Sequence, residues 1–462
     1  AHPLDYYWLW SYEIWSANPD GPGVTREQVR AVESDIAIAQ EVLAELGSPF
    51  RIAHAGWILG TTENPAELES VYPPSVPFYS SWGEADGYDE LSPERVKWPG
   101  IHMEQDWGLL QWQGGVYAAW EDIVAAQGVE AEGSIGNIWR TTMIDPNIAG
   151  VKDLHWAYGT SGSPPRMAIE GDKWVWMEEL YRDWARRLFG AEVSPRVAAI
   201  LAEYDGQVPT PTGWTEWGPG EVLSNARTWR QVRGDYAFVN ALEALRDDVV
   251  GQENRYRFDY WLKTMQLLRE MAEFGTIRYE FERMMRRHRH ERALEKMTEL
   301  ARVHERITTL QLERARNASD VGEIIQFQLV NWKATILDRF EDDLRRGLGR
   351  RIPAEAYPTS EYLGDPRVFV APSRTTVREG EPLTITATVL GVDAAPRVYL
   401  RALGEVHYRE LAMRPVAEAV YSVDVPPQAG DFEYYVFVPT GGEALLWPVT
   451  APSRNHVVVV AP

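Results

Sequence analysis

Two acidic residues stand out because each follows a strand-like run and lies among aromatic residues. Glu13 comes shortly after the apolar run Tyr6–Trp10, and Glu104 ends the run Gly100–Glu104. A carboxyl group surrounded by Trp and Tyr loses hydration and favours a general-acid role, whereas one held by hydrogen-bond donors stays ionised as a base or nucleophile. Two such groups flanking a sugar ring are the catalytic groups of glycosidases. The pattern therefore predicts Glu13 as general acid/base and Glu104 as nucleophile or second carboxylate.

The competing interpretation is that each carboxylate has a structural or solvent role. The chain contains 68 Asp and Glu residues, so some must lie near the ends of strands by chance. For either residue taken alone, the structural role is the more frequent one. The catalytic interpretation draws its strength from the pair.

Aromatic residues near these carboxylates are candidates for substrate binding. Eleven of the 20 Trp residues lie before residue 166. Such a concentration indicates either a large aromatic core or a cleft whose flat rings stack on sugar rings. An arginine at the end of a strand could hold a carboxylate or hydroxyl groups of a substrate, or else form an ion pair within the protein. The candidate substrate-binding residues are Trp10, Trp15, Trp57, Asp106, Trp107, Trp139 and Arg140.

The elements that carry these residues alternate between strands and helices over residues 1–165. Strands are expected at Tyr6–Trp10, Arg51–Leu59, Pro77–Ser81, Gly100–Glu104 and Ser134–Trp139. An amphipathic helix that starts near Thr25 and stops at Gly47 separates the first two. This alternation predicts a parallel α/β sheet, in which reacting groups lie at the carboxyl ends of the strands.

Counting these strands against a (β/α)8 barrel gives the two carboxylates a specific placement. If the last strand is the eighth, Glu13 ends strand four and Glu104 ends strand seven, which resembles the placement of the catalytic pair in a large clan of retaining glycosidases. Five strands do not close such a barrel. We therefore expect that the first three strands precede Ala1, that a second chain supplies them, or that the sheet is open.

Two further regions follow the α/β region. Residues 166–362 have an almost continuous helical pattern, with helices expected at Trp174–Phe189, Gly234–Val250, Asn254–Phe274, Arg278–Ala315 and Val321–Leu348, and with a Pro/Gly-rich connection at Asp205–Gly220. Residues 363–462 contain short strand-like runs separated by turn residues, which is typical of an immunoglobulin-like β-sandwich. The expected fold class is thus a multidomain protein: the carboxyl-terminal part of a TIM-type barrel, a helical domain and a β-sandwich.

Composition and missing motifs exclude several functions. The formal net charge of −22 disfavours nucleic-acid binding, and no apolar run approaches the roughly 20 residues of a membrane span. The chain has no cysteine, no Gly-rich phosphate loop, no zinc-protease motif and no serine-hydrolase elbow. His288 and His290 are two residues apart, a spacing that on a helix points them to different sides. We therefore expect no cofactor and no metal.

Several segments resemble large bacterial glycoside hydrolase-like proteins organised like α-glucuronidases and α-N-acetylglucosaminidases. The segments that carry this resemblance are Asp5–Trp10, Gly56–Gly60, Met103–Asp106, Asn137–Thr141, Asp183–Gly190 and Arg257–Leu262. The resemblance implies a barrel followed by a helical domain, and a secreted enzyme of polysaccharide degradation in the extracellular space or periplasm. The sequence departs from the pattern at Ile138, where related chains have a His before Trp-Arg-Thr.

The expected function is therefore that of a glycosidase acting on a polysaccharide or oligosaccharide, either as one chain or as the carboxyl-terminal chain of a larger enzyme. The alternative is a non-catalytic carbohydrate-binding or assembly subunit, because hydrolase-like folds also serve in binding. The expected partners are the carbohydrate substrate, a second chain that supplies barrel strands, and further copies of this chain.

Overall fold

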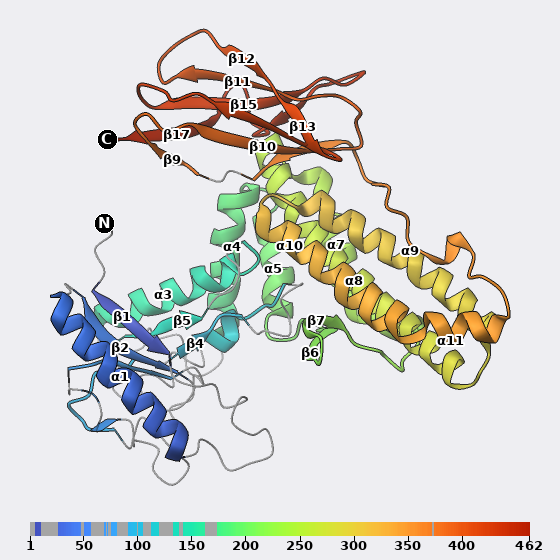
Figure 1. The fold of residues 1–462 in the computed structure, drawn as a ribbon, viewed down its shortest axis with the longest axis horizontal. Helices are drawn as coiled ribbons and strands as arrows, with labels where there is room; N and C mark the ends of the chain where they lie inside the picture. Colours follow the sequence, from blue (N-terminus) through green and yellow to red (C-terminus); the bar gives the residue numbers. More distant parts are fainter. Residues whose placement is uncertain are drawn as a thin grey trace. The chain divides into compact units, whose positions relative to one another are not determined.

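A computed structural model describes residues 5–10, 26–47, 50–56, 69–70, 72, 75–80, 91–98, 100–104, 112–119, 133–137, 142–161, 173–371 and 374–462. The chain divides into two compact units. The first comprises Ala1–Gln105, Gln113–Trp184 and Leu201–Val208, and the second comprises Asp106–Trp112, Ala185–Ile200 and Pro209–Pro462. Figure 1 shows the chain coloured from the amino to the carboxyl terminus.

The first unit contains parallel strands that pair in the order of the chain. These strands are β1 (Tyr6–Trp10), β2 (Arg51–Gly56), β3 (Phe78–Ser80), β4 (Gly100–His102) and β5 (Ile135–Asn137). β1, β2 and β3 form one sheet, β4 and β5 form another, and Lys97 bridges to Phe78 of β3 in the parallel sense. Each described strand begins within two residues of the start of the corresponding strand predicted from the sequence.

Helix α1 (Arg26–Leu46) follows the predicted amphipathic pattern. Val32 and Ile36 are buried, in keeping with the three-and-four spacing of an apolar face. Gly47 ends the helix with φ +59°, a backbone conformation that a residue without a Cβ adopts without strain. The helix thus connects the parallel neighbours β1 and β2 as a crossover.

Helices α3 (Asp145–Ser161), α4 (Lys173–Phe189) and α5 (Ser194–Tyr204) follow the strands. In the first unit a small core forms around Ile101 and Met103 from β4 and its end, with Ala119, Ile144 and Val151. Gly190, which has φ +97°, directly follows the last residue of α4. Both ends of this helix therefore agree with the sequence prediction to within one residue.

Between residues 229 and 356 the second unit is helical. Its helices are α6 (Trp229–Val232), α7 (Ala237–Glu243), α8 (Gln252–Arg286), α9 (His290–Arg314), α10 (Ala318–Phe327) and α11 (Arg339–Leu348), with short 3-10 turns at Arg233–Tyr236, Arg246–Asp248 and Ala354–Ala356 and a π-helix at Gln328–Asp338 between α10 and α11. α8 and α9 pack along each other, and their core includes Phe274, Phe281 and Ile307. Figure 1 shows α8 in yellow-green and α9 in yellow.

Two of the predicted helix boundaries are wrong. The sequence placed a break near Gly275, but α8 continues through that residue to Arg286, and the break comes at residues 287–289, where His288 has φ +53°. The helix predicted at Gly234–Val250 is divided into a 3-10 turn, α7 and a second 3-10 turn.

The connection predicted at Asp205–Gly220 contains a β-hairpin, with β6 (Thr212–Thr215) paired to β7 (Gly218–Val222). The side chain of Asn331, which is fully buried, accepts a 2.6 Å hydrogen bond from the Val222 amide and donates to the Gly220 carbonyl at 3.0 Å. Arg278 of α8 pairs with Glu221 at 2.6 Å. These bonds fix the hairpin to the helices.

The last hundred residues form two antiparallel sheets and one parallel edge pair. Their strands are β8 (Arg367–Val370), β9 (Thr376–Arg378), β10 (Leu383–Leu390), β11 (Arg397–Ala402), β12 (Arg409–Ala412), β13 (Arg414–Ala417), β14 (Val420–Val425), β15 (Phe432–Val438), β16 (Leu445–Trp447) and β17 (His456–Ala461). One sheet has the order β13-β14-β10-β8 and the other β12-β11-β15-β17-β9, with β16 beside β15. Inward residues of both sheets, such as Ile385 and Val436, share one core.

Candidate functional site

The carboxyl ends of the strands in the first unit are the region where the sequence predicts chemistry. In register, Trp10 of β1 lies beside Ala55 of β2, and His102 of β4 lies beside Asn137 of β5. Within each of these two sheets the strands are parallel, so their carboxyl ends lie at one edge. Ligands of parallel α/β sheets bind at this edge.

Glu104 lies two residues beyond the end of β4, and its side chain is buried, with 2% of the residue's surface exposed. Buried carboxyl groups are uncommon unless they are paired or hydrogen-bonded. The burial of a carboxyl group at a strand end makes Glu104 the candidate catalytic residue that is best defined in the described part of the chain.

The backbone beside Glu104 is held by Asn147 from α3. The Asn147 side-chain amide donates hydrogen bonds to the carbonyl of Met103 at 2.7 Å and to the carbonyl of Gln113 at 3.1 Å, while its oxygen accepts one from the Gly115 amide at 3.2 Å. Asn147 itself has no exposed surface. Its three bonds join the end of β4 to residues 113–115 and to α3, so the main chain at Glu104 has a rigid support.

The packing around Met103 leaves little room for change. A Cβ at Gly136 of β5 would collide with the methyl end of the Met103 side chain. A Cβ at Gly115 would lie 2.8 Å from the side-chain nitrogen of Asn147, which is closer than real Cβ contacts. Glycine at these two positions lets β5 and the 113–115 segment approach the residues that precede Glu104.

Asp205 is a second buried carboxylate of the first unit, but its contacts indicate a structural role. It accepts hydrogen bonds from the Tyr117 amide at 2.9 Å, the Val116 amide at 3.2 Å and the Tyr181 hydroxyl at 2.5 Å. Burial raises the pKa of Asp205 above its ordinary range, and the three donors oppose that shift. Because both carboxylate oxygens are engaged, Asp205 joins residues 116–117 to α4 and is not available to a substrate.

Most of the residues that the sequence singled out lie outside the described residues. These are Glu13, Trp15, Trp57, Asp106, Trp107, Trp139 and Arg140. Trp10 is described only by its backbone, as the last residue of β1. The structure therefore places Glu104 fully and Trp10 in part, and the predicted pairing of Glu13 with Glu104 stays a prediction.

Two tryptophans of the first unit, Trp8 and Trp98, contact other aromatic residues. The ring of Trp8 lies 5.6 Å from that of Trp98 and 6.1 Å from that of Tyr79. Trp112, which belongs to the second unit, has no exposed surface. Trp112 is thus a core residue, Trp8 and Trp98 are half-buried, and stacking by the candidate tryptophans stays a prediction.

The described residues contain neither a cluster of metal ligands nor a membrane-spanning helix. No group of three or more His, Asp or Glu side chains there could hold a metal ion. Within the same residues, no helix combines the length and apolar composition that crossing a lipid bilayer requires.

Comparisons with known proteins assign no family to the chain. No family model matches it, and no curated protein is similar to it. Among solved structures it is similar to an engineered protein, with 11% sequence identity over 87% of this chain and 90% of that chain and a TM-score of 0.20. A TM-score this low supports no inference about fold or function.

Proposed function

We propose that this chain is a glycoside hydrolase that cleaves glycosidic bonds in a polysaccharide or oligosaccharide with two carboxylates, Glu104 and Glu13. The observation that carries the proposal is the buried carboxyl group of Glu104 at the carboxyl end of β4, beside a backbone fixed by Asn147. Catalytic groups must be held to within a fraction of an ångström, and supports of this kind provide such positioning. The resemblance of Met103–Asp106 and its neighbouring segments to glycoside hydrolase-like proteins favours the same function.

In the proposed mechanism, the two carboxyl groups act on opposite sides of the scissile bond. Glu13 donates a proton to the leaving-group oxygen as the bond to the anomeric carbon breaks. Glu104 acts on the opposite face of that carbon, either by attacking it directly or by deprotonating the attacking water. Direct attack forms a covalent glycosyl-enzyme that water then hydrolyses with Glu13 as the base, so the anomeric configuration is retained overall; this route requires a carboxyl separation of about 5–5.5 Å. Attack by water in a single step inverts the configuration and requires about 6.5–9.5 Å. The configuration of the first product therefore reports which role Glu104 has.

The substrate would be held by the remaining predicted residues. Arg140 would hydrogen-bond hydroxyl or carboxylate groups of the sugar, and Asp106 would accept hydrogen bonds from its hydroxyl groups. The indole rings of Trp10, Trp15, Trp57, Trp107 and Trp139 would stack on sugar rings. An enzyme with this substrate class would act outside the cytoplasm, where its polysaccharides occur.

Release of reducing sugar from a panel of neutral and acidic polysaccharides tests the proposal. The wild-type chain is compared with Glu104→Gln and with Glu94→Gln, a control at an exposed glutamate of the same unit. We expect hydrolysis by the wild type and the control, and none by Glu104→Gln. Saccharide binding by a folded wild-type chain, without turnover on any substrate, would instead favour the alternative of a non-catalytic carbohydrate-binding subunit.

A further inference from the structure

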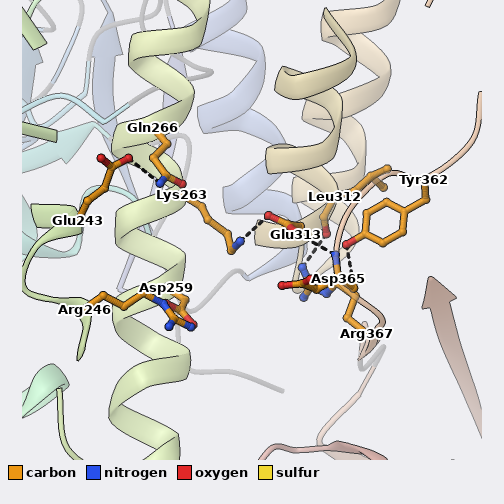
Figure 2. Close-up of polar contacts among 10 residues, drawn as sticks. All are labelled: Glu243, Arg246, Asp259, Lys263, Gln266, Leu312, Glu313, Tyr362, Asp365 and Arg367. Atoms are coloured by element: carbon orange, nitrogen blue, oxygen red, sulfur yellow. Dashed lines mark hydrogen bonds and ion pairs between the residues drawn. The ribbon is translucent and has the colours of Figure 1, made fainter. Parts of the chain in front are cut away.

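The second unit contains a crevice of about 620 Å³ that the sequence did not indicate. It is bounded by α8, by the end of α9, by residues 365–368 and by residues 443–449. Figure 2 shows part of its walls, with Asp259, Lys263 and Gln266 on α8 opposite Glu313, Asp365 and Arg367. These α8 residues are spaced by four and three, so they share one face of the helix.

Several charges of these walls neutralise one another. Arg246 donates two hydrogen bonds to Asp259, at 2.7 and 3.0 Å, and Lys263 pairs with Glu313 (Figure 2). Glu313 also accepts a 3.3 Å hydrogen bond from the Asp365 amide. These groups have little charge left to offer a ligand.

Arg316 differs from these residues because no carboxylate pairs with its guanidinium group in the described part of the chain. One of its nitrogens, Nη2, donates to the carbonyl of Tyr256 at 2.5 Å. The guanidinium carbon lies 4.1 Å from the centre of the Tyr256 ring and 4.5 Å from that of Tyr260. Burial lowers the pKa of Arg316. Contacts with two aromatic rings orient the group, while most of its five N–H donors stay unused.

Arg367, also on the crevice, likewise has no carboxylate partner among the described residues, although more of its donors are engaged than those of Arg316. Its two terminal nitrogens donate to the carbonyls of Leu312 at 2.6 Å and Ala315 at 2.8 Å. Burial is the largest cause that lowers its pKa, and the charge of Arg316 adds to the effect. The unpaired carboxylates of the crevice, Asp365 and Glu443, belong to exposed residues. The lining as a whole therefore has no net charge, but its unpaired positive charges lie on half-buried residues and its unpaired negative charges on exposed ones.

We propose that this crevice binds an acidic saccharide, with its anionic group between the guanidinium groups of Arg316 and Arg367. Arginine is suited to this task because its planar group binds carboxylate or sulfate oxygens through two parallel hydrogen bonds. Gln252 and Trp447 also line the crevice and offer an amide group for sugar hydroxyls and an aromatic ring for a sugar face. Gln266 donates its amide to Glu243 at 2.8 Å and offers its carbonyl oxygen. The choice of a saccharide rests on the proposed function, whereas the choice of an anion rests on the two arginines. The anionic group is a uronate carboxylate or a sulfate ester.

Calorimetric titration of the full chain tests this inference. The probes are neutral, uronate-containing and sulfated oligosaccharides of equal length, together with inorganic sulfate. We expect one acidic class to bind at least about tenfold more tightly than the neutral one. Arg316→Gln and Arg367→Gln should each weaken that binding by about tenfold to a hundredfold. Arg350→Gln, which alters an exposed ion pair with Glu291, is the matched control and should leave binding unchanged.

The outcomes separate the alternatives. The acidic class that binds more tightly identifies the anionic group. Equal binding of neutral and acidic saccharides, or unchanged binding by both arginine variants, would overturn the proposal. Binding of inorganic sulfate as tight as that of the saccharide would overturn the assignment of a saccharide ligand.

Arg316→Lys keeps the charge and should retain part of the affinity even if Arg316→Gln fails to fold. If the chain hydrolyses a saccharide in a Glu104-dependent way but binds acidic and neutral saccharides equally, only the crevice proposal is refuted. If it binds acidic saccharides but hydrolyses none, only the proposed function is refuted.

Discussion

The side-chain amide of Asn147 donates a 2.7 Å hydrogen bond to the main-chain carbonyl of Met103, the residue directly before Glu104. This bond links α3 to the end of β4, 44 residues earlier in the chain. If Glu104 is catalytic, Asn147 is a positioning residue that acts through the backbone and touches no substrate.

Replacing Asn147 with Ala should therefore lower kcat more than it raises KM. The change removes three hydrogen bonds and leaves buried backbone groups without partners, so we expect a loss of about 3 kcal/mol in the free energy of unfolding. Steady-state kinetics and denaturant unfolding measure the two effects.

Asn331→Ala is the matched control for this experiment, because Asn331 is an equally buried side chain that holds backbone groups of the β6–β7 hairpin. It should cost a similar free energy of unfolding. At temperatures where both variants are folded, a kcat loss in Asn331→Ala as large as that in Asn147→Ala would show that the effect is a general loss of stability.

His304 should make the second unit sensitive to acid. Its ring has no exposed nitrogen and lies 5.2 Å from the rings of both Phe327 and Trp332, and burial lowers its pKa to about 3. Below pH 6.5 the unfolded chain takes up a proton at His304 while the folded chain does not, so the stability present at neutral pH is lost as the pH falls toward 3.

His304→Leu removes this contribution. Between pH 7 and pH 4 the variant should lose about 3 kcal/mol less stability than the wild type. Denaturant unfolding at several pH values measures the difference. Met297→Leu, a substitution in the same core, should shift stability equally at all pH values. Parallel curves for His304→Leu and the wild type would refute the prediction.

Gly275 in α8 provides a test of packing against helix propensity. Alanine normally stabilises a helix interior by about 1 kcal/mol relative to glycine. At Gly275, however, a Cβ would lie 2.5 Å from the main-chain oxygen of Leu223. We expect Gly275→Ala to destabilise the chain by about 1–3 kcal/mol, whereas Gly322→Ala in α10, where a Cβ meets nothing within 4 Å, should stabilise it. Thermal unfolding distinguishes the two, and stabilisation by both would contradict the close approach.

Gly275 also shows why some helix boundaries could be predicted from the sequence and others could not. α1 and α4 have a regular apolar spacing and a glycine stop, which are local signals. Gly275 resembles a stop as well, but α8 continues through it because the glycine accommodates the carbonyl of Leu223. That contact joins residues about 50 positions apart, and no local pattern in the sequence encodes it.

The same holds for the candidate functional residues: local sequence patterns predict some of them, and others depend on contacts between distant parts of the chain. The position of Glu104 at a strand end follows from a local pattern, whereas its aromatic setting stays a prediction because Trp107 lies outside the described residues. Asn147 could not be predicted, because its partners lie more than 30 residues away. Arg316 and Arg367 were missed for a related reason: what distinguishes them from other arginines is the absence of a pairing carboxylate in the described fold.

The most direct test of the account is the turnover and the binding of one cleaved oligosaccharide by Glu104→Gln. The substitution keeps the size and shape of the side chain and removes its ability to act as a carboxylate. We predict that kcat falls by at least about a thousandfold, while the dissociation constant stays within about threefold of the wild-type value. Turnover within tenfold of the wild type by the folded variant would show that Glu104 is not a catalytic carboxylate and would contradict the proposed function.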